Sequence, residues 1–164
     1  MDDDPRFDQA RRKAFRLLFL RGRSVQELRS RLLERGFENP TVSRVLSNLQ
    51  EMRVLDDAAF AREWARSLAA NRLCGNRRIE TSLREKGISD SLIKEAIAAA
   101  RKELPESDAL AAVLRKKLQG RIFADLDRRE KQRLARSLLG KGFPSRLVFD
   151  FLRIEEEGSF DERE

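Results

Sequence analysis

The same pattern of apolar and polar positions occurs three times along the chain. In each copy an apolar residue lies four positions before a leucine, and a basic residue, a glycine and a second apolar residue follow that leucine. The copies span residues 28–37, 79–88 and 134–143. Residues four apart share one face of an α-helix, and a basic residue followed by glycine favours a helix end. Each copy therefore predicts an amphipathic helix that stops at its glycine.

A second helix follows each glycine, and a further helix precedes each copy. Apolar residues lie six and ten positions after every glycine, as Val42 and Leu46, Ile93 and Ile97, and Val148 and Leu152. The preceding helices are predicted near residues 8–21, 57–72 and 105–119. Helix-start signals agree with this division: Ser24 with Glu27 has the form of a capping box, Asp56 or Asp57 can cap the second of the preceding helices, and Asn39 can cap the helix that begins at Pro40.

The predicted fold is all-α, with three tandem three-helix repeats that are similar to helix-turn-helix units. No stretch alternates with period two, so we expect no strands. The repeats are placed at 9–54, 55–103 and 104–154, with acidic tails at 1–8 and 155–164. Units of about 50 residues are close to the lower limit for a self-sufficient core. Neighbouring repeats should therefore pack against each other in an elongated or crescent array.

Charge is distributed unevenly along the 164 residues. The whole chain carries +7, but the two tails carry −3 and −5, which leaves +15 on the body. We interpret the tails as solvated, disordered segments. A basic body predicts an acidic partner, with nucleic acid as the first candidate and a membrane surface as the second.

The residue types that are missing exclude several kinds of chemistry. The chain has no histidine, no tyrosine and a single cysteine, Cys74. This excludes histidine-based triads, a tyrosine nucleophile, an intrachain disulfide and a multi-cysteine zinc site. The longest apolar run is the six residues 109–114, far short of the roughly 20 that a membrane span needs. We expect a cytoplasmic monomer that is not an enzyme and has no cofactor or metal.

The central part of the chain resembles the RecX family of recombination regulators. The resemblance lies in the segments VLDDAAFAREW at 54–64 and RRIETSLREKGI at 77–88, and it extends over about 10–154. Residues 73–76 depart from the family pattern, which more often has a Gly/Lys-rich linker with Gly-Pro before the arginine pair. The resemblance implies a protein of DNA repair and the SOS response that binds the RecA recombinase filament on single-stranded DNA, and double-stranded DNA as a further partner. It also implies inhibition of the RecA ATPase, of filament extension and of strand exchange.

Basic side chains of the second repeat are the candidate contacts for RecA or DNA. The helix near 57–72 places two arginines on one face, and the next helix places two more seven residues apart at nearly the same azimuth. The candidate residues are Arg62, Arg66, Arg77, Arg78, Arg84 and Lys86. Arginine suits phosphate and carboxylate through its planar fork. A merely solvated face is an equally good interpretation of these cations.

Two other motifs favour structural roles. Phe60, Trp64 and Leu68 form one helical stripe, so we expect Trp64 to pack in the core rather than stack on a base. Asp56 and Asp57 fit a helix cap better than a metal site. An alternative function is a stand-alone basic helical DNA-binding protein, since three-helix units are used in this way. No motif indicates base readout, however, and three tandem units need no palindromic dimer.

Overall fold

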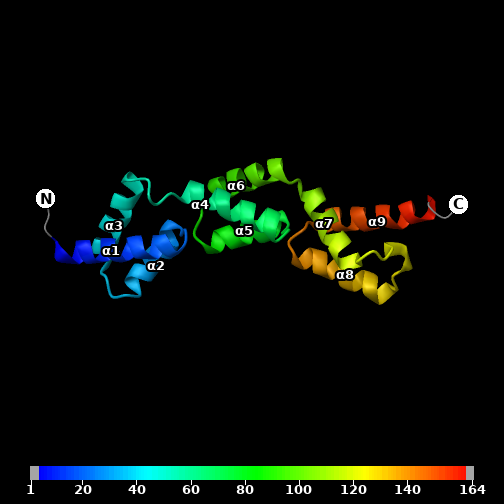
Figure 1. Cartoon of the computed structure of the whole chain (residues 1–164), viewed down its shortest axis with the longest axis horizontal. Coiled ribbons are helices and arrows are strands. Elements are labelled where there is room, and N and C mark those ends of the chain that lie inside the picture. Colours follow the sequence, from blue (N-terminus) through cyan, green and yellow to red (C-terminus); the bar gives the residue numbers. More distant parts are fainter. Residues whose placement is uncertain (1–3, 162–164) are drawn as a thin grey trace.

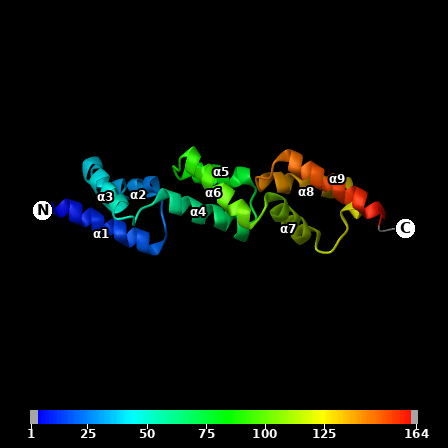
Figure 2. The ribbon, with the colours of Figure 1, turned by 90° about the horizontal axis from the view of Figure 1, so that it is seen from above.

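The computed structural model describes residues 4–161, with side chains described from 4 to 153. Within that range the chain is helical and contains no strand. The elements are α1 (Pro5–Leu20), α2 (Val25–Leu33), α3 (Asn39–Glu51), α4 (Asp57–Arg66), the π-helical turn η1 (Ser67–Asn71), α5 (Asn76–Glu85), α6 (Asp90–Glu103), α7 (Glu106–Leu118), the 3-10 turn η2 (Phe123–Asp125), α8 (Arg128–Gly140) and α9 (Ser145–Asp161). They form three groups in a row, with the two chain ends at opposite ends of the molecule (Figures 1 and 2).

Each group of three helices has a hydrophobic core of its own. We call these groups repeat 1 (α1–α3), repeat 2 (α4–α6 with η1) and repeat 3 (α7–α9 with η2). The repeated leucine pattern supplies the centre of every core: Leu28 and Leu32, Ile79 and Leu83, and Leu134 and Leu138 are all buried. The all-α array of three tandem three-helix repeats that the sequence predicts is therefore confirmed. Its shape is elongated (Figure 1).

The glycine at the end of each pattern stops its helix as expected. Gly36, Gly87 and Gly142 have φ angles of +83°, +74° and +90°, a region that residues with a β-carbon rarely adopt. At the first two of these turns the next residue donates its N–H back to the helix, from Phe37 to Leu32 and from Ile88 to Leu83. The chain thus reverses direction at the same position in every repeat.

Helix starts agree with the sequence in part. The capping box of Ser24 and Glu27 is confirmed, and Asp56 caps α4 by accepting from the N–H groups of residues 58 and 59. Asn39 is not a cap, because it is already the first residue of α3 and Glu38 occupies the cap position. The segments expected as acidic tails are also partly helical. Asp4 caps α1 at Pro5, and α9 continues to residue 161; residues 1–3 and 162–164 lie outside the described residues.

The core face of α4 differs from the predicted one. Leu68 is buried as expected, but Phe60 and Trp64 are only partly buried, and Ala61 and Ala65 form the buried positions of α4. Small side chains on α4 and on α6 allow these two helices to approach closely, which leaves no room for an indole between them. Trp64 therefore packs at the edge of the core of repeat 2.

The start of α2 packs against the turn between α5 and α6 in repeat 2. Ser24, which is fully buried, donates its hydroxyl to the carbonyl of Lys86 at 2.6 Å. The N–H of Val25, the first residue of α2, donates to Asp57 Oδ1 at 2.8 Å. Both groups belong to helix ends that lack partners within their own helix. The junction of repeats 1 and 2 is thus a set of caps shared between repeats.

The start of α5 meets the turn between α8 and α9 in the same way. Gly75 donates its N–H to the carbonyl of Lys141 at 2.9 Å, and Arg77 donates to that of Gly142 at 3.1 Å. The N–H of Asn76, the first residue of α5, donates to Glu106 Oε1 at 2.7 Å. Asp57 and Glu106 are the first residues of α4 and α7, so equivalent positions make equivalent bonds. One mode of junction therefore joins both pairs of repeats.

The second junction has no room for a β-carbon. A β-carbon on Gly75 would overlap the backbone of Gly142, and one on Gly142 would overlap Arg78, whereas one on Gly36 would meet nothing within 4 Å. In Gly36→Ala only the positive φ of the residue is unfavourable, so the unfolding free energy should fall by about 1–2 kcal/mol. Gly142→Ala has the same positive φ and also overpacks the junction, which costs about a further 1–3 kcal/mol. Urea unfolding should therefore show a clearly larger loss of unfolding free energy for Gly142→Ala than for Gly36→Ala. Equal costs for the two variants would show that the junction is not close-packed.

Candidate partner-binding surfaces

Lys86 is a structural residue of the junction between repeats 1 and 2. Its ammonium lies 2.8 Å from Glu27 Oε1 and 4.2 Å from the centre of the Trp64 ring, with the side chain 17% exposed. The indole stacks on Phe60 and donates its N–H to the hydroxyl of Ser82 at 3.0 Å. The charge of Lys86 is thus already paired between repeats. We do not include Lys86 in the surface proposed below, although the sequence suggested it as a contact residue.

Two of the predicted arginines have carboxylate partners within repeat 2. Arg66 on α4 forms an ion pair with Glu103 at 2.9 Å. Arg84 on α5 contacts Glu80 at 2.7 Å and Asp90 at 3.2 Å. Hydrogen bonds to Glu80 and then to Asp90 hold the pKa of Arg84 above its ordinary value. These arginines are exposed, but nearby carboxylates offset their charge.

Three predicted arginines are exposed and form no ion pair with any residue that the structure describes. Arg62 lies on α4, and Arg77 and Arg78 lie in the first turn of α5. The backbone of α5 holds the latter two in place, because the N–H of Arg77 is fixed to repeat 3 and that of Arg78 bonds to the carbonyl of Gly75. Their guanidinium groups extend from a rigid helix start. Among the six predicted residues, these three best suit contacts with phosphate or carboxylate groups.

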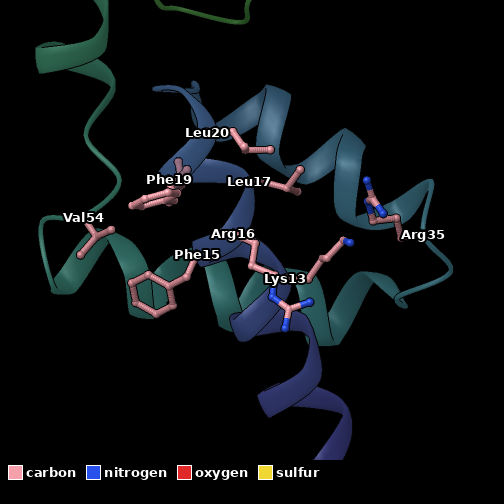
Figure 3. A pocket seen from close by; sticks show the side chains of 9 residues that line it. Lys13, Phe15, Arg16, Leu17, Phe19, Leu20, Arg35 and Val54 are labelled. Atoms are coloured by element: carbon pink, nitrogen blue, oxygen red, sulfur yellow. The ribbon is translucent and has the colours of Figure 1, made fainter.

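Repeat 1 carries an apolar groove that the sequence pattern did not predict. The groove has a volume of about 860 Å³ and is lined by Lys13, Phe15, Arg16, Leu17, Leu18, Phe19, Leu20, Arg35 and Val54 (Figure 3). The signal was present in the sequence as the run of four apolar residues 17–20. Four successive residues are spread around most of a helical turn, so they cannot all face one core. Leu17 is buried, but Phe19 is 91% and Leu20 75% exposed.

The described residues carry neither a metal cluster nor a membrane helix. No group of three His, Cys, Asp or Glu residues between 4 and 161 could hold a metal ion. In the same part of the chain, no helix is both long and apolar enough to cross a bilayer. Cys74 is buried, and a guanidinium nitrogen of Arg101 donates to its carbonyl at 2.6 Å.

These features define a class of protein: an elongated array of three-helix repeats with hydrogen-bonded junctions and exposed basic side chains. Family models for the first, second and third three-helix domains of RecX match residues 10–49, 56–97 and 106–152. The chain belongs to the RecX family of regulatory proteins.

Individual relatives support this assignment. Regulatory protein RecX of Mycobacterium sp. (strain JLS) is 32% identical over 167 residues, which cover 99% of this chain and 90% of the relative. Regulatory protein RecX of Prosthecochloris aestuarii is 32% identical over 148 residues, covering 90% and 92%. The crystal structure of RecX from Lactobacillus salivarius shares the fold, with a TM-score of 0.78 at 20% identity over 93% of this chain and 97% of that one.

Glu27 makes the first junction dependent on pH. Burial alone would raise its pKa, but hydrogen bonds from Lys86, Arg21 and Ser24 together hold the pKa below its ordinary value. A lowered pKa contributes stability that is present above the unfolded value, about 4.3, and is lost as pH falls through the folded value. The pKa of Asp57 shifts in the opposite direction, because burial raises it.

Glu27→Gln tests this dependence. The change leaves Lys86 without its counter-charge, so it should lower the unfolding free energy at pH 7 by about 1–3 kcal/mol. The difference in unfolding free energy between wild type and variant should become smaller as the pH falls from about 5 to 3. Glu34→Gln removes only an exposed pair with Arg31 and should cost about 0.5 kcal/mol or less. Urea titrations across this pH range measure the unfolding free energy of the wild type and both variants. A difference between wild type and Glu27→Gln that stays constant with pH would contradict the role of Glu27.

Proposed function

We propose that this chain is a negative regulator of the RecA recombinase. It binds the RecA filament on single-stranded DNA and inhibits the ATPase, filament extension and strand exchange. The match of all three RecX domains, in order, in one chain is the observation that carries this proposal. The relatives named Regulatory protein RecX support it along almost the whole chain.

An elongated, rigid array is suited to a helical filament. A filament repeats its subunits along a groove, and a row of three linked repeats can contact several of them at once, so that each contact adds to the next through effective concentration. The array acts as a monomer in this proposal, because each junction is made within one chain. It acts by binding and has no catalytic residue, cofactor or metal of its own.

The contact with DNA is assigned to repeat 2. Arg62, Arg77 and Arg78 are exposed, and none has a carboxylate partner among the described residues. A phosphate can therefore bind them without first displacing an internal ion pair. Phosphate contacts are independent of sequence, so the same surface would also bind double-stranded DNA, although a filament-bound strand is the proposed ligand.

The regulator proposal predicts inhibition at low stoichiometry. RecA ATPase on single-stranded DNA should fall when the chain is added at amounts well below those of RecA, because one bound molecule acts on several subunits. The chain alone should hydrolyse no ATP and cut no DNA. Inhibition that appears only when the chain covers the DNA would instead indicate simple competition by a stand-alone DNA-binding protein.

The three unpaired arginines can be tested against the two paired ones. Changing Arg62, Arg77 and Arg78 to Ala should weaken binding to single-stranded DNA and lower the salt slope of log K by about 2, since each lost phosphate contact removes about 0.7. The matched control changes Arg66 and Arg84 to Ala and should alter the slope by less than one. Each exposed substitution should cost within about 0.5 kcal/mol of stability.

Salt titrations of fluorescence anisotropy with a labelled oligonucleotide measure these slopes. An unchanged slope in the triple variant, with its fold intact by circular dichroism, would remove the DNA contact from repeat 2. The paired arginines would become the better candidates if their variant lost more of the slope than the triple variant.

A further inference from the structure

The groove of repeat 1 is an apolar surface that repeat 1 itself does not cover. Six of its nine lining residues are apolar, and they lie on the last two turns of α1 and just after α3. Figure 3 shows Phe15, Phe19 and Val54 on one side of the groove. In repeat 3, by contrast, the connector after α7 folds back as η2 and buries Phe123 in the core. The connector after α1 is only the four residues 21–24, so no such segment covers its end.

The groove also carries an unbalanced positive charge. Its lining contains Lys13, Arg16 and Arg35 and no carboxylate. None of these three cations forms an ion pair with a residue that the structure describes. Two other grooves differ in this respect, because Arg121 in a groove of repeat 3 is paired with Glu130 at 2.8 Å and Arg84 in a groove of repeat 2 is paired with both Glu80 and Asp90. The apolar floor and unpaired cations of repeat 1 together complement a ligand that is both apolar and acidic.

We propose that the groove of repeat 1 is a docking site for an acidic amphipathic helix of a partner protein. The helix would place bulky apolar side chains at positions i, i+3, i+4 and i+7 against Phe19, Leu20 and Val54, as in other helix-in-groove contacts. Aspartate and glutamate at its edges would pair with Lys13, Arg16 and Arg35. This deepens the proposed function, because it names the chemistry of the partner segment that repeat 1 binds.

A protein helix fits this groove better than a nucleic acid strand does. Binding of single strands relies on bases stacked on aromatic faces. Here four of the six apolar lining residues are the aliphatic Leu17, Leu18, Leu20 and Val54, which offer no stacking face. A volume of about 860 Å³ accommodates several side chains at once. Phe19 is 91% exposed, so a docked helix would bury most of this aromatic side chain.

The test uses a defined peptide as the probe. A fluorescein-labelled helical peptide of about 14 residues carries Leu or Phe at i, i+3, i+4 and i+7 and Asp or Glu at its flanking positions. It is titrated with the full chain, and a scrambled peptide of the same composition is titrated in parallel. The amphipathic peptide should bind at least ~10-fold more tightly than the scrambled one.

Variants of the groove then locate the binding. The double change Phe19→Ala and Leu20→Ala should weaken peptide binding at least ~10-fold, and because both side chains are exposed, the fold should be retained. Phe149→Ala removes an exposed phenylalanine of repeat 3, 56% exposed, and should change nothing. Arg16→Glu should weaken binding of the acidic peptide and strengthen binding of a counterpart with lysine at the flanking positions.

Several results would overturn the proposal. One is equal binding of the amphipathic and scrambled peptides, and another is full binding by the double variant. A third is a double variant that no longer binds a labelled oligothymidylate but still binds the peptide, which would make the groove a DNA site. A fourth is self-association of the wild type in sedimentation that the double variant abolishes, because the occupant would then be a second copy of the chain.

The peptide assay contains neither RecA nor DNA, so its result does not depend on the proposed function. If the peptide binds in the groove but the wild type does not inhibit RecA, the docking site stands and the regulator proposal fails. If the wild type inhibits RecA but the peptide does not bind, the regulator proposal stands and the docking site is wrong.

Discussion

The array depends on one constraint: the polar groups at helix ends must have partners, and small repeats cannot supply all of them alone. An α-helix leaves its first N–H groups without acceptors inside the helix. At both junctions the N–H of the first residue of the middle helix donates to a carboxylate of the next repeat, from Val25 to Asp57 and from Asn76 to Glu106. Folding of one repeat thereby completes the helix start of the repeat before it, which makes the three repeats one continuous body.

The same junctions determine where charge is available for binding. Lys86 and Glu27 neutralise each other at the first junction, and the second junction fixes the start of α5, so that Arg77 and Arg78 extend from a rigid base. Cations thus have two different roles in this chain. Those at the junction join the repeats, whereas Arg62, Arg77 and Arg78 form no ion pair with any described residue and can meet phosphate or carboxylate groups. The proposed action along a filament needs both, since contacts on separate repeats reinforce each other only if the repeats keep a fixed spacing.

The sequence predicted most of the fold and less of the candidate site. Apolar spacing and turn glycines are local signals, and they identified the three repeats and the helix that precedes each turn glycine. The role of Lys86 depends on Glu27, which it meets across a junction, and the place of Trp64 depends on which face of α4 packs in the core of repeat 2; helical periodicity specifies neither. The groove at Phe19 was missed for a related reason, because a run of apolar residues indicates a helix but does not show which of its members the core can cover.

The most direct test of the continuous body is the distance between repeats 1 and 3 in solution. Spin labels at positions 12 and 129, both exposed, report this distance by pulsed electron paramagnetic resonance in a Cys74→Ala background. The account predicts one narrow distance distribution, which broadens when Gly75→Ala opens the second junction. A broad distribution in the parent protein would contradict it, because the repeats would then move independently and the shared caps would not join them.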